Sequence, residues 1–209
     1  MAVKQTIAII GAAGKLGSAL AKRLLDAYRL LLFDSDTAKL EQLTEQMKKN
    51  NPHADIECSC CPVEASWEAD VIIPAVPFTM YPDLIAKIRK VATQKIVISV
   101  SSGLTESAIQ EHKKNWSMAE VLQQDLPYSK VVKAFNTVPA IEFERPENER
   151  ELIDVFIAGN DAEAVYTVES LVRVTGFHPV YAGPLPVSRT LENLRPGEQY
   201  KDFLATHSN

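Results

Sequence analysis

The chain has 209 residues and a formal net charge of -5, with 46% hydrophobic and 23% charged residues. These proportions are typical of a soluble globular protein and exclude a disordered or fibrous one. The negative charge, without a stripe of lysine and arginine, argues against a nucleic-acid partner. The longest apolar run, at 71–78, is far shorter than the roughly 20 residues that span a bilayer, and the N-terminus resembles a core strand rather than a secretory leader. We therefore expect no membrane partner and a cytoplasmic location.

Residues 3–17, VKQTIAIIGAAGKLG, predict a buried strand, a glycine-rich turn and the start of a helix. Glycines at Gly11, Gly14 and Gly17 let the backbone approach a dinucleotide pyrophosphate, whose charge the N–H groups at the start of the helix can hold. The usual G-x-G-x-x-G pattern would place a glycine at Ala12, and we expect the site to tolerate this methyl group. The alternative is a tight strand-to-helix turn that binds no ligand.

A second strand at 29–33 ends in Asp34, at about the distance from Gly17 where dinucleotide-binding proteins carry an acid. A carboxylate there can accept hydrogen bonds from the adenosine ribose and would repel a 2′-phosphate, which favours NAD over NADP. Two alternatives stay open. Lys39 could reach a phosphate, and Asp34 or Asp36 could simply cap the next helix.

Strands and helices continue to alternate along the chain, without a low-complexity linker or an internal repeat. The expected elements are a helix at 36–49, strands at 55–60 and 70–75, a helix from Tyr81, a strand at 95–100, a polar helix at 104–125, strands at 130–135 and 152–158, a helix at 161–175, and a final helix after Pro186. We therefore predict an α/β fold with a doubly wound, mostly parallel Rossmann sheet. Residues 1–209 would form one dinucleotide-binding domain, in which a small C-terminal α/β extension, 137–209, packs against the sheet edge and closes the active-site cleft.

Three cysteines, Cys58, Cys60 and Cys61, lie close together and have no partner elsewhere in the chain. Their odd number and crowding do not fit a disulfide framework, and their spacing matches no standard zinc site. We interpret them as reduced thiols on a strand and expect no metal.

Ligands of open parallel sheets lie beyond the carboxyl ends of the strands, so the residues that follow each strand are candidates for the nicotinamide end. These are Ala75, Val76 and Pro77, the segment from Ser99 to Gly103, and Asn136 with Thr137. Val76 and Pro77 offer an apolar floor for the ring, and Asn136 could hydrogen-bond the carboxamide or the electron acceptor. The alternative is that these are ordinary loop residues and helix caps, as Ser101 and Ser102 would be.

Three further segments carry a resemblance: KVVKAFNTVPA at 130–140, AGNDAEA at 158–164 and AGPLPVSRTLENL at 182–194. With the glycine turn, they resemble the family of NADP-dependent oxidoreductases that reduce the deazaflavin coenzyme, and the cytosolic reductase domain of the six-transmembrane metalloreductases. The resemblance implies hydride transfer between a nicotinamide nucleotide and a flavin-like ring stacked against it. The family's phosphate-binding Ser/Arg pair is replaced by Asp34 and Ser35.

The same resemblance assigns roles to individual residues. The pyrophosphate would lie on Ala13 to Leu16, the adenosine end at Asp34 and Ser35, the nicotinamide at Pro77 and Asn136, and the second ring at Val138 and Leu185. The resemblance, the glycine motif and the strand ends together give the candidate cofactor-binding residues, which are Gly11, Ala12, Ala13, Gly14, Lys15, Leu16, Gly17, Asp34, Ser35, Ala75, Val76, Pro77, Ser99 and Asn136. The acceptor-side candidates are Pro77, Asn136, Val138 and Leu185.

We therefore expect an NAD(P)-dependent oxidoreductase that uses NAD or NADP, with a flavin or deazaflavin as second substrate. Hydride passes directly between stacked rings, which fits the absence of an evident acid-base cluster in the sequence. The partner would be a small-molecule electron acceptor, and a homodimer is left open. Two alternative functions stay open: an NAD-dependent dehydrogenase of a small hydroxy acid, and a non-catalytic module that senses NAD(P).

Overall fold

The computed structural model describes residues 4–101, 116–150 and 153–194. One sheet of eight strands runs through the described molecule in the order β3-β2-β1-β4-β5-β6-β7-β8. The strands are β1 (Thr6–Ile10), β2 (Arg29–Phe33), β3 (Ile56–Cys58), β4 (Val71–Pro74), β5 (Ile96–Ser99), β6 (Lys130–Lys133), β7 (Asp154–Gly159) and β8 (His178–Gly183). The first six strands are all parallel to their neighbours. The strand order proceeds one way from β1 to β3 and the opposite way from β4 to β6, so the topological switch point of a Rossmann sheet lies between β1 and β4. The predicted fold class is confirmed.

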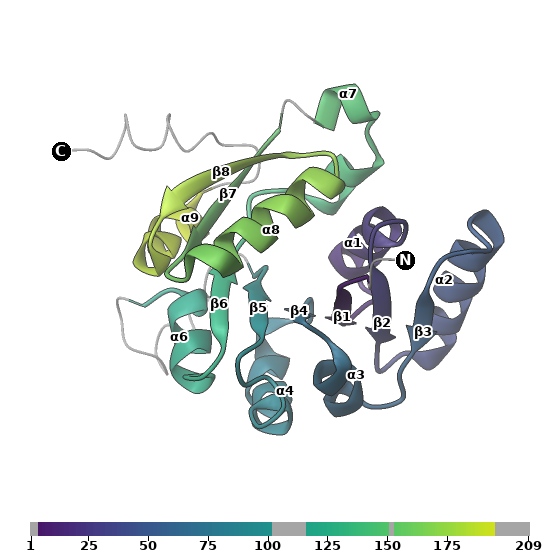
Figure 1. Cartoon of the computed structure of the whole chain (residues 1–209), viewed down its shortest axis with the longest axis horizontal. Helices are drawn as coiled ribbons and strands as arrows, with labels where there is room; N and C mark the ends of the chain where they lie inside the picture. Colours follow the sequence, from purple (N-terminus) through teal and green to yellow (C-terminus); the bar gives the residue numbers. More distant parts are fainter. Residues whose placement is uncertain (1–3, 102–115, 151–152, 195–209) are drawn as a thin grey trace.

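Helices cover both faces of the sheet (Figure 1). They are α1 (Lys15–Leu24), α2 (Thr37–Asn50), α3 (Pro62–Glu68), α4 (Tyr81–Ile88), α6 (Met118–Asp125), α7 (Glu147–Arg150), α8 (Ala162–Val174) and α9 (Ser188–Asn193). Short 3-10 turns are η1 (Phe78–Met80), η2 (Ala140–Glu144) and η3 (Leu185–Val187). None of the described helices combines the length and the apolar character needed to cross a membrane.

Alternating side chains of β1 explain why the sheet is covered on both sides. Ile7 and Ile9 pack in one hydrophobic cluster with α1, α2 and α8, whereas Ala8 and Ile10 pack in a second cluster with α3, α4 and α6. A strand buried on both faces reads as a continuous apolar run, which is why β1 could be predicted from the sequence. Both faces of the sheet therefore contribute to the core.

The C-terminal part of the chain extends the sheet itself. Strand β7 pairs antiparallel with β6, and β8 pairs parallel with β7. Helix α8 covers one face of these strands, and Leu191 of α9 packs against Phe156 and Ala158 on the other. The extension thus continues the sheet at its edge through hydrogen-bonded strands, and α8 and α9 enclose the added strands.

Several predicted bounds need correction. The segment 62–68 is helix α3, which the sequence analysis did not predict, because only Ala65 and Ser66 of this short helix are buried and its apolar periodicity is weak. The strand expected at 55–60 is shorter, since only Ile56–Cys58 pairs with β2. Of the polar helix expected at 104–125, only Met118–Asp125 is helical in the described part of the chain, and it begins after the N-cap residue Ser117. Residues 104–115 lie outside the described residues, as do Ser102, Gly103 and residues 3 and 152 of two predicted strands.

Candidate functional site

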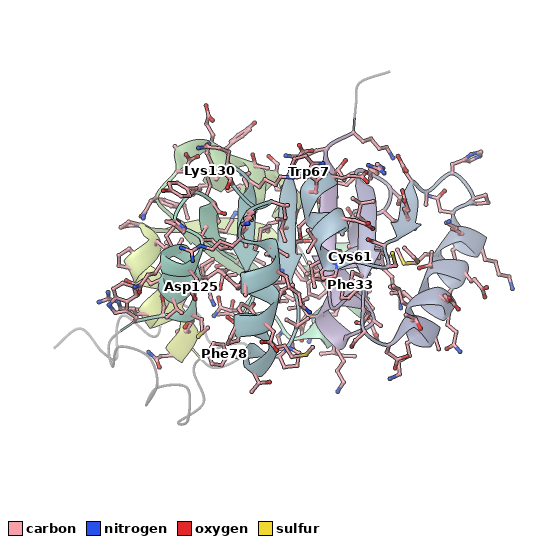
Figure 2. The ribbon with its side chains drawn as sticks, turned by 90° about the horizontal axis from the view of Figure 1, so that it is seen from below. Phe33, Cys61, Trp67, Phe78, Asp125 and Lys130 are labelled. Atoms are coloured by element: carbon pink, nitrogen blue, oxygen red, sulfur yellow. The ribbon has the colours of Figure 1, made fainter. Side chains whose placement is uncertain are left out.

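A groove of about 250 Å³ lies at the carboxyl ends of β1, β2 and β4, on the side of the sheet where the strands end. In Figure 2, Phe78, which follows β4, lies at this end of the molecule, whereas Trp67 and Lys130 lie at the opposite end, where strands begin. The residues that line the groove are Gly11, Ala13, Gly14, Phe33, Asp34, Ser35, Asp36, Lys39, Ala75, Val76, Pro77 and Met80. The groove therefore occupies the switch point of the sheet, where ligands of doubly wound proteins bind.

The glycine turn needs glycine at its two ends. Gly11 has a φ of 90°, and a Cβ atom there would lie 2.7 Å from the carbonyl oxygen of Ala75. A Cβ atom on Gly17 would overlap the carbonyl oxygen of Gly11, so this glycine allows α1 to pack closely on the turn. Ala12 is fully buried in the core and does not line the groove, so its methyl group leaves the groove open.

The first turn of α1 points backbone N–H groups toward the groove end of the helix. Gly14 is the N-cap residue, and the first helical hydrogen bond runs from Ser18 N to Gly14 O over 2.9 Å. The amides of Lys15, Leu16 and Gly17 precede this bond, so they have no acceptor within the helix. Together with the helix dipole, they form a site suited to an anion.

The carboxylate of Asp34 ties the end of β2 to the glycine turn. Its Oδ2 accepts the N–H of Ala13 and its Oδ1 accepts the N–H of Asp36, each over 2.9 Å. Each carboxylate oxygen can accept a second hydrogen bond, so the group keeps acceptor capacity toward the groove. Lys39, also at the groove, is paired with Asp36 at 2.6 Å, and its side chain is 70% exposed.

An apolar wall follows β4. Ala75, Val76 and Pro77 line the groove together with Met80 of η1. The backbone beneath this wall is held by Tyr81, whose buried hydroxyl donates to the carbonyl oxygen of Pro74 over 2.8 Å. Burial raises the pKa of Tyr81 well above its ordinary range, so the hydroxyl stays protonated and remains a donor.

Asn136, after β6, is 8% exposed, and only one end of its side-chain amide is hydrogen-bonded. Its Nδ2 donates to the carbonyl oxygen of Leu191 in α9 over 2.7 Å. Its Oδ1 is buried and has no hydrogen-bond partner within the described ranges, and the same holds for Oγ1 of Thr137. An unsatisfied buried acceptor is costly, so a ligand that donates a hydrogen bond here would relieve that cost.

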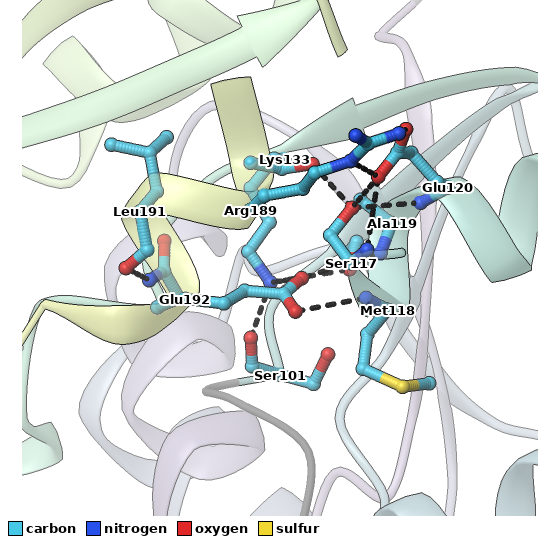
Figure 3. A network of polar contacts seen from close by, with 12 residues as sticks. Ser101, Ser117, Met118, Ala119, Glu120, Lys133, Arg189, Leu191 and Glu192 are labelled. Atoms are coloured by element: carbon cyan, nitrogen blue, oxygen red, sulfur yellow. Dashed lines mark hydrogen bonds and ion pairs between the residues drawn. The ribbon is translucent and has the colours of Figure 1, made fainter. Parts of the chain in front are cut away.

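Lys133, at the end of β6, is fully buried and was not predicted as a site residue. Its Nζ lies 2.8 Å from Oε1 of Glu192 and also donates to the carbonyl oxygen of Ser101 (Figure 3). Oγ of Ser99, at the end of β5, lies 3.5 Å from the same Nζ. Burial lowers the pKa of Lys133, while the Glu192 carboxylate acts in the opposite direction. The ion pair thus joins the end of β6 to α9, and the contacts of Lys133 with Ser99 and Ser101 add the end of β5.

The structure brings most of the predicted nucleotide residues to one groove. Those on its wall are Gly11, Ala13, Gly14, Asp34, Ser35, Ala75, Val76 and Pro77. Lys15, Leu16 and Gly17 form the first turn of α1 beside it, while Ser99 and Asn136 are buried at the ends of β5 and β6. Val138 and Leu185 are also buried, and they belong to hydrophobic clusters on opposite faces of the sheet. Phe33, Asp36, Lys39 and Met80 complete the groove. Of these, the sequence analysis named Lys39 as a residue that could reach a phosphate and Asp36 as a possible helix cap, and Asp36 is the N-cap of α2.

The chain is similar to known reductases. Residues 6–103 match the family model described as NADP oxidoreductase coenzyme F420-dependent. The chain is 29% identical over 199 residues to the F420-dependent NADP reductase of Methanocaldococcus jannaschii, covering 91% of this chain and 89% of that protein. It is 32% identical over 129 residues to metalloreductase STEAP3 of Rattus norvegicus, covering 62% of this chain but only 25% of that longer protein.

Solved structures show the same fold. A hypothetical protein of Sinorhizobium meliloti superposes with a TM-score of 0.74 and 29% identity, covering 93% of this chain and 92% of that one. A pyrroline-5-carboxylate reductase of Coxiella burnetii gives a TM-score of 0.69 at 16% identity, covering 98% of this chain and 68% of that one, and supports the fold alone.

The Rossmann sheet, the anion site at α1 and these relatives define an NAD(P)-dependent oxidoreductase. Within that class, the resemblance found in the sequence is confirmed: residues 6–103 match the model of the coenzyme F420-dependent NADP oxidoreductase family, and the chain is similar over most of its length to an F420-dependent NADP reductase.

Proposed function

We propose that this protein transfers a hydride between a nicotinamide nucleotide and a flavin- or deazaflavin-like acceptor, with NADH preferred over NADPH. The observation that carries the proposal is the groove at the switch point, which joins an anion site on α1, a carboxylate at the end of β2 and an apolar wall after β4. The name of the Methanocaldococcus jannaschii relative supports a deazaflavin acceptor.

The groove would receive the pyrophosphate and the adenosine ribose of a dinucleotide. The amides of Lys15, Leu16 and Gly17 would hold the pyrophosphate, since they have no helical acceptors and lie at the positive end of the α1 dipole. The N–H of Ala13 already donates to Asp34, so we assign it to shaping the turn. Asp34 and Ser35 would bind the adenosine ribose.

The preference for NADH rests on charge at the adenosine end. The Asp34 carboxylate would repel a 2′-phosphate, and the nearby Lys39 is already paired with Asp36. A phosphate-binding site usually presents an unpaired arginine or lysine. We therefore propose that NADPH binds more weakly than NADH, although the family is named for NADP.

The nicotinamide end would lie between the apolar wall and the ends of β5 and β6. Val76 and Pro77 would pack on the ring, and the unsatisfied Oδ1 of Asn136 would accept a hydrogen bond from the carboxamide. When bound, the nicotinamide supplies the hydride, so the protein's task is to hold two rings in contact and exclude water.

The acceptor would stack on the far side of the nicotinamide, under the C-terminal extension. The proposed boundaries are residues 1–209 for one dinucleotide-binding domain and 137–209 for the extension that closes its cleft. Val138 and Leu185 would contact the second ring. Because both side chains are buried, in hydrophobic clusters on opposite faces of the sheet, this contact requires local movement of the segments that carry them.

Steady-state oxidation of NADH and NADPH tests the proposal, with FMN, a deazaflavin, a ferric chelate and a set of small keto acids as acceptors. The expected result is turnover with a flavin or deazaflavin and a higher kcat/KM for NADH. Turnover with a keto acid alone would indicate a small-substrate dehydrogenase. Nucleotide binding in a calorimeter without turnover on any acceptor would indicate a sensing module.

A further inference from the structure

The hydrogen bond between Asn136 and Leu191 fixes which end of the amide faces the proposed nicotinamide site. A backbone carbonyl can only accept, so the NH₂ group of Asn136 must face the Leu191 oxygen, 2.7 Å away. The Oδ1 atom is thereby turned elsewhere and is left buried and unpaired among the described residues. The position of α9 thus determines that Asn136 offers an acceptor.

Helix α9 is in turn anchored by the residue next to Leu191. The Glu192 carboxylate accepts from Lys133 Nζ and from Met118 N, each over 2.8 Å, and from Ala119 N over 3.3 Å (Figure 3). These partners come from β6 and from the N-terminus of α6. One carboxylate therefore fixes α9 against two elements at the end of the sheet.

The burial of this ion pair makes the anchor specific. The Lys133 side chain is 0% exposed and that of Glu192 is 5% exposed. A shift of α9 along its axis would separate the two charges in the protein interior, where water cannot solvate them in place of the lost partner. Other positions of the helix are therefore strongly disfavoured. A surface ion pair would not impose this selectivity, because either charge could be solvated.

We propose that Lys133 and Glu192 are positioning residues that hold α9 so that Asn136 presents Oδ1, rather than its NH₂ group, to the nicotinamide carboxamide. This inference rests on the proposed function, since it places the nicotinamide beside Asn136. It assigns a role to two residues that need not touch the nucleotide themselves.

A nucleotide analogue that lacks the carboxamide N–H gives a direct readout. In the reduced 3-acetylpyridine analogue of NADH, a methyl ketone replaces the amide, so it cannot donate to Oδ1. The wild-type protein is expected to bind this analogue about 5- to 20-fold more weakly than NADH, because the analogue leaves the buried acceptor unpaired. A purely structural role for the ion pair would not alter this ratio in a folded variant.

The test compares the NADH-to-analogue ratio of dissociation constants, and of KM at similar kcat, in four proteins. Glu192→Gln removes the charge at nearly constant shape, and Lys133→Met removes the opposite charge. Each variant is expected to bring the ratio within about 2-fold of unity. The matched control is Arg189→Gln, which breaks the pair between the half-exposed Arg189 of α9 and Glu120 of α6 but leaves Glu192 in place, and should keep the wild-type ratio. Circular dichroism and thermal melting establish that each variant is folded.

Should Glu192→Gln fail to fold, Glu192→Asp keeps the charge on a shorter side chain and should give an intermediate ratio. A wild-type ratio in folded Glu192 or Lys133 variants, or no discrimination by the wild type, would overturn the inference. Because the ratio is measured by binding, it remains measurable if no acceptor is turned over. Failure of the proposed function would instead appear as absence of turnover, or as absence of binding of both nucleotides.

Discussion

The carboxylate of Asp34 accepts a hydrogen bond from the backbone N–H of Ala13, 2.9 Å away, and so joins the end of β2 to the glycine turn that follows β1. Its other oxygen accepts the N–H of Asp36, at the start of α2. Asp34 therefore shapes the proposed adenosine end of the groove even before any ribose is bound. This dual position makes its substitution informative about both stability and specificity.

Replacing Asp34 with serine is expected to reduce the preference for NADH over NADPH by about tenfold, which corresponds to about 1.4 kcal/mol. The reason is that the repulsive charge near the 2′ position is lost. Dissociation constants for both nucleotides, measured by calorimetry, check this. Asp34→Asn is the matched control for shape: it keeps an acceptor oxygen without the charge and should show a similar loss. Unchanged ratios in both variants would refute the ribose assignment.

Replacing Gly17 with alanine should destabilise the protein and weaken nucleotide binding together. The added methyl group would overlap the carbonyl oxygen of Gly11, so α1 must move away from the turn. Overpacking of this kind costs about 1–3 kcal/mol. Urea unfolding gives the loss of stability, and titration with NADH gives the loss of affinity. Ser18→Ala, one residue along the helix, should leave both nearly unchanged, and an unaltered Gly17→Ala protein would contradict this packing.

Arg23 of α1 should contribute to docking of the C-terminal extension. Its guanidinium donates through Nε and Nη2 to the carbonyl oxygen of Phe143 in η2. Arg23→Met keeps most of the aliphatic stem but removes both donors, and should lower the free energy of unfolding by about 1 kcal/mol. The urea midpoint measures this effect. Lys22→Met, at the neighbouring exposed position, serves as the control and should change it by less than half as much.

Asp161, the N-cap residue of α8, should make stability depend on acid pH. The N–H of Ala164 and the Lys130 ammonium hold the pKa of Asp161 below its ordinary value. A lowered folded pKa means that this contribution is present above about pH 4, the pKa of an unfolded aspartate, and is lost as pH falls through the folded value. Asp161→Asn should therefore lower the urea midpoint at pH 7 and have a diminishing effect at about pH 3. Glu41→Gln, on the exposed face of α2, is the control, and an equal effect of Asp161→Asn at both pH values would contradict the prediction.

Much of the sheet could be predicted because its strands are buried on both faces. The apolar runs at Arg29–Phe33 and Val71–Pro74 have this pattern, and the glycine turn marks the junction between β1 and α1. Helix α3 escaped prediction because its burial is confined to two small side chains. Local periodicity detects an element only when one of its faces buries a row of large apolar groups.

The groove was predictable because its residues follow strand ends that the sequence already located. The Lys133–Glu192 pair was not, since the two residues are 59 positions apart and nothing in either local pattern marks a charge as buried. In the sequence KVVK, Lys133 has the pattern of an ordinary polar residue at the end of a strand. Only the three-dimensional structure, in which Glu192 of α9 bonds to Lys133 of β6 and to the start of α6, reveals that this ammonium lies in the interior.

The buried lysine also restricts how the sequence can change over time. Loss of either partner alone leaves an uncompensated interior charge, at a cost of about 3–5 kcal/mol. This is a large share of the 5–15 kcal/mol by which domains are usually stable. A lineage can therefore exchange Lys133 and Glu192 only together, so homologous chains with the same α9 should covary at these two positions, carrying both charges or neither.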